Sequence, residues 1–162
     1  MRRFNGTLPW TKSCFVCGED NPHGLHLKSW VEGKVVRLKY TTRASDVGYR
    51  NLVHGGILAT LLDEVMTWAA IISAGRMCVA AEMTTRLKKP VEVAMDLDVA
   101  AWTEKLNRRL ILVQSEARDS ENKVLVGAQG KYTPMPQAKL SLASKDFVYD
   151  QNCIQPSELF PD

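Results

Sequence analysis

Residues 54–75 read HGGILATLLDEVMTWAAIISAG, one of the most apolar stretches of the chain. Its apolar side chains recur at helical spacing and Gly75 is a good stop signal, so the sequence predicts a helix over about 56–73. The stretch is nearly long enough to span a membrane, but Asp63 and Glu64 lie at its centre. Because charged side chains are costly inside a bilayer, we predict a buried core helix and no membrane association.

One face of this helix carries small or polar residues. Gly56, Thr60, Asp63 and Thr67 follow one another at spacings of four, three and four residues, which places them on a single stripe. A carboxylate among apolar neighbours loses hydration, and a close helix contact could be made by Asn, Ser or Ala at a lower cost. We therefore favour a functional role for Asp63 over a structural one.

Both flanks of the helix show the alternation of apolar and polar residues that predicts half-buried strands. The predicted strands cover 25–31, 35–40, 78–87, 95–103, 109–117 and 124–132, with turns at 32–34, 105–107 and 120–122. Successive hairpins favour an antiparallel sheet, so the predicted class is α+β. A sheet wrapped around one long central helix would bury that helix on most sides, which explains its composition.

We divide the chain into an irregular lead-in over 1–23, one domain over 24–133 and a tail over 134–162. Its 162 residues, 45% of them hydrophobic, suffice for one globular core. The net charge of +3 is too small to indicate nucleic acid, although it suits an anionic small ligand. Residues 1–15 lack the apolar segment of a secretory signal, and four cysteines require no disulfide framework, so we expect a reducing, cytoplasmic setting.

Cys14 and Cys17 form a C-x-x-C pair, a spacing found in zinc and redox sites. Cys78 and Cys153 each stand alone, so we favour a structural role for the pair and predict no metal site. Glu64 lies about 100° around the helix from Asp63, on a different face. We expect it to be a structural carboxylate paired with an arginine or with a backbone group.

The two glycines that open the helix suit a developing negative charge, because backbone N–H groups at a helix start are unpaired. Gly56 and Asp63 are separated by about 10 Å along the axis, at 1.5 Å per residue. A carbonyl bound by the Gly55 or Gly56 N–H is therefore out of reach of Asp63 in the same chain. If both groups act on one carbonyl, they belong to different subunits, and a homodimer with two shared sites follows.

Several short motifs resemble the PaaI-type branch of the hotdog-fold acyl-CoA thioesterases. The most specific is the His-Gly-Gly of 54–56 with an acidic residue, Asp63, seven positions after the second glycine. The resemblance covers about residues 14–133. Its pieces are CFVCG (14–18), NPHGL (21–25), GY (48–49), HGG (54–56), LDE (62–64), RLKKP (86–90) and GAQGKY (127–132).

The resemblance implies a hotdog fold, a dimer or dimer of dimers, and hydrolysis of a coenzyme A thioester without a further cofactor. In that family the position of Asp63 holds the catalytic carboxylate, and that of Gly55 supplies an oxyanion-hole N–H. The position of Thr67 often carries an assisting hydroxyl. Asp63 would act as a general base on water or as a nucleophile that forms a mixed anhydride, and the sequence leaves both routes open.

Four further residues are candidates for substrate binding. Gly56 could add a second N–H donor, Thr60 could orient Asp63 or the water, and His54 is expected to shape the turn into the helix through a backbone hydrogen bond. Many relatives carry Gln or Asn where Gly48 stands, and Ser or Thr where Ala80 stands. Asn51 lies close by and is our candidate substitute for the missing amide.

Two alternatives to hydrolysis remain open. A non-catalytic acyl-CoA or acyl-carrier binder is compatible with the missing polar groups at Gly48 and Ala80, but it would not need Asp63. A hotdog-fold hydratase shares the spacing from Asn51 to His54, yet Tyr49 stands where an acidic residue is expected. The predicted partners are thus an acyl-CoA substrate and further copies of the chain.

Overall fold

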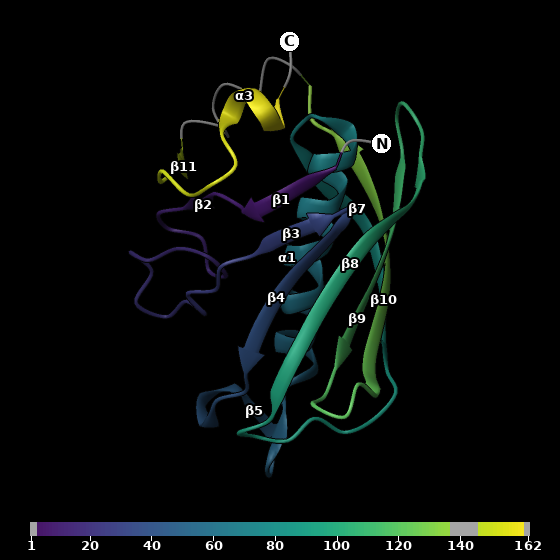
Figure 1. Ribbon diagram of the computed structural model, residues 1–162. Coiled ribbons are helices and arrows are strands. Elements are labelled where there is room, and N and C mark those ends of the chain that lie inside the picture. The colour runs from purple at the N-terminus through teal and green to yellow at the C-terminus, as the bar shows by residue number, and fades with distance from the viewer. Residues whose placement is uncertain (1–2, 137–145, 161–162) are drawn as a thin grey trace.

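The computed structural model describes residues 3–136 and 146–160. Within this part of the chain, seven strands form one antiparallel sheet in the order β1-β3-β4-β8-β9-β10-β7, and one long helix, α1, packs against it (Figure 1). The predicted α+β class, with an antiparallel sheet around a central helix, is confirmed. The elements of this layer are β1 (Phe4–Thr7), β3 (Trp30–Gly33), β4 (Val35–Thr41), α1 (Gly55–Ala74), β7 (Cys78–Leu87), β8 (Asp96–Leu106), β9 (Ile111–Arg118) and β10 (Val124–Pro134).

Helix α1 begins and ends where the sequence predicts. His54 caps its N-terminus, and Gly75 ends it in the left-handed conformation at φ 63°, with its N–H bonded to the Ile71 carbonyl at 2.8 Å. Leu61, Leu62 and neighbouring apolar side chains are fully buried. Although α1 is long and apolar enough to cross a membrane, it packs against β4 and β7 to β10, so it is a core helix.

Successive side chains along the strands alternate between the sheet face toward α1 and the face away from it. In β4, Val36 and Leu38 are buried against the helix side, while Arg37 and Lys39 point to the other side. Strand β7 differs, because most of its side chains are exposed and β10 is its one strand partner among the described residues. Val79 and Leu87 are 46% and 58% exposed. The sheet therefore ends in a long open edge.

The N-terminal segment is more ordered than the sequence predicts. Strand β1 joins the main sheet beside β3, and β2 (Trp10–Thr11) pairs with β11 (Phe147–Val148). These strands are too short to show periodicity, and they are fixed by tertiary contacts. The predicted strand over 25–31 begins only at Trp30, because His26 adopts a φ of 55° that interrupts extended backbone.

The C-terminal tail folds back on this segment. The backbone of Cys153 forms an isolated parallel β-bridge with that of Thr7. Leu159 of the short helix α3 (Pro156–Leu159) is fully buried. Within the predicted tail, positions 137–145 and 161–162 lie outside the described residues. The described part of the tail thus packs on the chain's own N-terminal strands.

The loop before α1 contains the short helix η1 (Ala44–Asp46) and a ribbon of β5 (Val47–Tyr49) with β6 (Leu52–Val53). The Asp46 carbonyl accepts a 2.8 Å hydrogen bond from the His54 N–H. This hydrogen bond and the ribbon therefore fix the position of the residue that precedes the first turn of α1.

Candidate active site

Asp63 lies midway along α1 on the least buried side of the helix. Gly56 is exposed, and Thr60, Asp63 and Thr67 are half-buried, whereas most other positions between Leu58 and Ile72 are buried, with Ala59 and Glu64 as further half-buried positions. The predicted stripe of small and polar residues is therefore a real surface feature. Asp63 is the carboxylate on that stripe.

Tyr132 of β10 holds Asp63, and sequence reasoning missed this partner. Its hydroxyl donates a hydrogen bond of 2.7 Å to Asp63 Oδ1, and its side chain is fully buried. Burial, followed by the negative charge of Asp63, raises the pKa of the Tyr132 phenol well above its usual range. The phenol thus stays protonated and fixes one carboxylate oxygen, and the other oxygen has no hydrogen-bond partner among the described residues.

The room for Tyr132 comes from a glycine two residues earlier on the same strand. A Cβ at Gly130 would lie 2.6 Å from Tyr132 Cε2, so no other residue fits there without displacing the ring. Strand alternation places 128, 130 and 132 on one face, and a buried tyrosine on an inward face needs a hydrogen-bond partner. The need of an inward-facing Tyr132 for a hydrogen-bond partner was the feature of the sequence from which its contact with Asp63 could have been predicted.

His54 shapes the start of α1 as predicted. Its Nδ1 accepts a 2.9 Å hydrogen bond from the Gly56 N–H, which makes the imidazole the N-terminal cap. The Gly56 N–H is therefore already occupied and is poorly placed to serve as a second oxyanion donor. Among the described residues, the Gly55 N–H shows no such hydrogen bond, so the predicted primary donor is available.

The two threonines of the stripe differ in what they contact. The Thr60 hydroxyl donates to the Gly56 carbonyl within α1 at 2.9 Å, which ties it to the helix backbone. The Thr67 hydroxyl interacts with the Tyr132 phenol, next to Asp63. Of the two, Thr67 is the one positioned near the carboxylate.

Asp46 fixes the loop that carries His54. Tyr40 donates a short hydrogen bond to its carboxylate, and Arg43 donates from its backbone N–H at 2.8 Å and from its guanidinium at 3.0 and 3.1 Å. Burial alone would raise the pKa of Asp46, but the hydrogen bonds from Tyr40 and Arg43 outweigh burial and lower it. This charged cluster anchors the approach to α1.

The backbone at Gly48 leaves no room for a side chain. A Cβ at this position would lie 2.9 Å from His54 Cα, so the backbone of β5 packs directly on the capping histidine. Asn51 is exposed in the turn between β5 and β6. Ala80 is exposed on the open edge strand β7. These placements leave the predicted role of Asn51 as a prediction.

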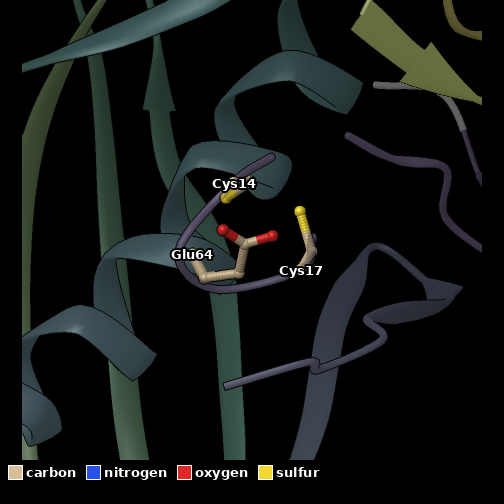
Figure 2. Close-up of side chains that lie close together, drawn as sticks. All are labelled: Cys14, Cys17 and Glu64. Carbon is tan, nitrogen blue, oxygen red and sulfur yellow. The ribbon is translucent and has the colours of Figure 1, made fainter. Parts of the chain in front are cut away.

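Glu64 has partners that the sequence did not predict. Its carboxylate accepts a 3.1 Å hydrogen bond from the Trp68 indole and lies beside Cys14 and Cys17 (Figure 2). No arginine or lysine pairs with it among the described residues. Burial first, and then the neighbouring Cys14, raise the pKa of Glu64 to about 7. The expectation of an arginine or backbone partner was wrong, because the fold brings a distant loop onto this helix face.

The Gly55 N–H and the Asp63 carboxylate cannot meet within one chain. Helix α1 is continuous from Gly55 past Asp63, so these residues are separated by about 12 Å along the axis at 1.5 Å per residue. A hollow of about 820 Å³ does occur on the sheet face remote from α1, and Arg37, Trp102 and Arg118 are among its lining residues. No candidate site residue lines it, so it does not join Asp63 to Gly55.

Residues 50–126 match the model of the Thioesterase superfamily. Among curated proteins, none is significantly similar in sequence. A crystal structure of a thioesterase superfamily protein aligns with a TM-score of 0.70 at 24% identity, over 75% of this chain and 60% of that protein. This chain thus spans less than two thirds of that protein's length.

Two further solved structures are similar. The PaaI protein of the E. coli phenylacetic acid degradation operon aligns with a TM-score of 0.64 at 19% identity, over 69% of this chain and 81% of PaaI. A Streptococcus mutans protein bound to acetyl-CoA aligns with a TM-score of 0.60 at 17% identity, over 63% of this chain and 82% of its own. These likenesses establish the hotdog fold, and the predicted resemblance to the PaaI-type thioesterases is confirmed at that level.

Proposed function

We propose that this chain, whose residues 50–126 match the model of the Thioesterase superfamily, hydrolyses an acyl-CoA thioester to a free acid and coenzyme A. The observation that carries the proposal is the half-buried Asp63 on the accessible stripe of α1, with one oxygen held by Tyr132. A binding protein has no use for an oriented carboxylate at this place. The superfamily match and the thioesterase neighbours support the same reaction class.

The site is shared between two subunits in this proposal. Gly55 and Asp63 lie about 12 Å apart on one rigid helix, so a single carbonyl cannot reach both in one chain. The open edge of β7, with exposed Val79 and Leu87, offers a second copy a strand to pair with. Antiparallel addition there would bring Asp63 of one protomer toward Gly55 of its partner.

The chemistry follows from these groups. The Gly55 N–H and the N-terminal end of the α1 dipole stabilise the oxyanion that forms on the thioester carbonyl. Asp63 either activates water or attacks the carbonyl, and the thiolate of coenzyme A leaves without needing a strong acid. Tyr132 keeps the carboxylate in one orientation, and Thr67 stands beside both groups.

Coenzyme A suits the charges near this site. Leu87 lies against the first turn of α1, since a Cβ on Gly55 would be 3.0 Å from its Cδ1. Arg86, Lys88 and Lys89 flank Leu87 and are exposed. Cations at the helix start would meet the phosphates of coenzyme A, and a solved neighbour from S. mutans is described as bound to acetyl-CoA.

The first test follows thiol release from short, medium, long and aromatic acyl-CoAs. Gly55→Pro removes the oxyanion N–H at a position where proline fits a helix, because Gly55 is the first helical residue and His54 is already extended. Gly55→Ala is the matched control, since it adds a Cβ against Leu87 but keeps the N–H. We expect thiol release to fall in the proline variant far more than in the alanine variant.

Mixing subunits tests whether the site is shared. Asp63→Asn and Gly55→Pro chains, each inactive alone, should regain activity when unfolded together and refolded, because a mixed dimer contains one intact site. No recovery in verified mixed dimers would contradict the shared site, as would a strict monomer in solution. Tight acyl-CoA binding with no thiol release from any substrate would replace the hydrolase with a binding protein.

A further inference from the structure

Cys14, Cys17 and Glu64 converge at one point although they come from distant parts of the sequence. Their two Sγ atoms and a carboxylate oxygen all lie within 4.8 Å of one another. Figure 2 shows the Glu64 carboxylate between the two sulfur atoms, with one oxygen directed to each cysteine. The cysteines come from the N-terminal loop, and Glu64 comes from the middle of α1.

The N-terminal loop has a backbone that presents both sulfur atoms in a tight turn. The Val16 N–H points at Cys14 Sγ at 3.3 Å, and the Gly18 N–H bonds to the Cys14 carbonyl at 2.9 Å. A Cβ on Gly18 would lie 2.5 Å from Cys14 N and O, so the turn requires glycine. N–H groups aimed at a cysteine sulfur stabilise a thiolate, the form that binds metals.

Two further hydrogen bonds hold this turn in place. The Leu25 N–H bonds to the Phe15 carbonyl and the Leu27 N–H bonds to the Val16 carbonyl, each at 2.8 Å. The cysteine positions are therefore set by the same interactions that fix the chain's path into β3. A preformed turn of this kind holds its ligands without needing a metal to fold it.

The charge at this place is not balanced by the protein. Glu64 has the Trp68 indole as a donor, and no lysine or arginine pairs with it among the described residues. A carboxylate taken out of water beside two thiols is stabilised in its charged form by a nearby cation. A disulfide between the cysteines would remove two metal ligands and leave the Glu64 carboxylate without a cation.

We propose that Cys14, Cys17 and Glu64 bind one zinc ion, with water at the fourth position. Two thiolates and a carboxylate are ligands that zinc accepts, at roughly 2.3 Å from sulfur and 2.1 Å from oxygen in tetrahedral geometry. Thiolates disfavour magnesium and calcium, which take oxygen ligands. Such separations place neighbouring ligand atoms about 3.6 to 3.8 Å apart, and the three ligand atoms already lie within 4.8 Å of one another.

The zinc ion would tether the N-terminal loop to the centre of α1. Glu64 is next to Asp63 in sequence but lies on another face, so the metal does not enter the reaction proposed above. This site does not depend on the thioesterase function, and its readouts are metal content and spectra.

The test uses the full chain, purified under reducing conditions without a metal-binding tag. Elemental analysis should find one zinc per chain. After removal of zinc, Co²⁺ titration should give a sulfur-to-cobalt charge-transfer band and the visible bands of tetrahedral cobalt, both lost on addition of Zn²⁺. Co²⁺ affinity should fall at least about tenfold in Cys17→Ser and in Glu64→Gln.

Cys78→Ser is the matched control, because it removes a buried thiol outside the cluster and should leave the cobalt spectrum unchanged. Absence of zinc and of a charge-transfer band in the unmodified protein would overturn the proposal, even if a variant failed to fold. So would a Cys14–Cys17 disulfide in the reduced preparation. Unchanged Co²⁺ affinity in Glu64→Gln would also overturn the three-ligand site.

Discussion

The fold gives its carboxylates many hydrogen-bond donors in one region and few in another. In the loop before α1, Asp46 is almost fully buried and is satisfied by Tyr40 and by the backbone and guanidinium of Arg43. In the middle of α1, Asp63 has one phenol donor and Glu64 has one indole donor beside two thiols. Hydrogen bonds lower the pKa of Asp46, whereas burial raises that of Glu64 to about 7.

The difference separates a structural carboxylate from the two carboxylates that we propose to be functional. A carboxylate whose acceptor sites are filled by the protein has nothing left to offer a ligand, so its contribution is to stability. A carboxylate with a free oxygen or without a cation can still accept a proton, attack a carbonyl or bind a metal. The number and charge of its partners, rather than its burial, therefore distinguishes the two regions.

The largest expected effect is on activity at Asp63. Asp63→Asn should lower kcat about 1000-fold, because the amide neither accepts a proton nor attacks, while it still accepts the Tyr132 hydrogen bond. Its free energy of unfolding should stay within about 1 kcal/mol of the parent. Thiol release and urea unfolding measure the two quantities. A variant that keeps its activity would remove Asp63 from the functional class.

Asp46 should show the reverse pattern. Asp46→Ala leaves the Tyr40 hydroxyl and the Arg43 guanidinium without their partner, so unfolding free energy should drop by about 3 kcal/mol in urea. Asp98→Ala is the control, because its pair with Arg37 is 3.4 Å long and half-exposed, and it should cost less than about 1 kcal/mol. Equal losses in the two variants would contradict the structural role assigned to Asp46.

Tyr132→Phe tests whether the single hydrogen bond to Asp63 matters for the activity of this carboxylate. Removing the hydroxyl that holds Asp63 should reduce kcat about tenfold and change stability by about 1 kcal/mol. The matched control is Tyr149→Phe, since the Tyr149 hydroxyl has no hydrogen-bond partner among the described residues. If both variants retain full activity, Tyr132 does not position the carboxylate.

The smallest effect is in the pH dependence of stability. The folded-state pKa of Asp46 lies below its ordinary value of 3.8, so its stabilisation is complete above that pH and is lost as pH falls through the folded-state pKa. The stability difference between the parent and Asp46→Asn should therefore be constant near neutral pH and shrink in acid. Urea unfolding from about pH 6 to about pH 2 measures it. A difference that grows in acid would reverse the sign.

Sequence periodicity was sufficient for the main framework. Helix α1 and strand β7 were predicted nearly to the residue, because a helix hydrogen-bonds within itself and a strand alternates between its two faces. The cap at His54 was predicted for the same local reason. Strands β1 and β2 were missed because two to four residues carry no measurable period.

The candidate site divides along the same line. The stripe of Gly56, Thr60, Asp63 and Thr67 follows from helical spacing alone, and the structure places all four on one less buried side. The hydrogen bonds of Gly56 and Thr60 could not be predicted from helical spacing. The spacing shows which residues share a face of the helix, but it does not show which atoms they bind. The catalytic roles themselves remain predictions.

The sequence by itself determined the helix α1 with its two ends, the long strands β4 and β7 to β10, and which residues share the stripe of α1. Only the tertiary structure decided that Tyr132 holds Asp63, that Gly48 packs on His54, and that Glu64 meets the two cysteines of a distant loop. The physical reason is range. Helix and strand patterns are fixed by neighbours a few residues away, whereas these contacts depend on how segments far apart in the chain pack against one core.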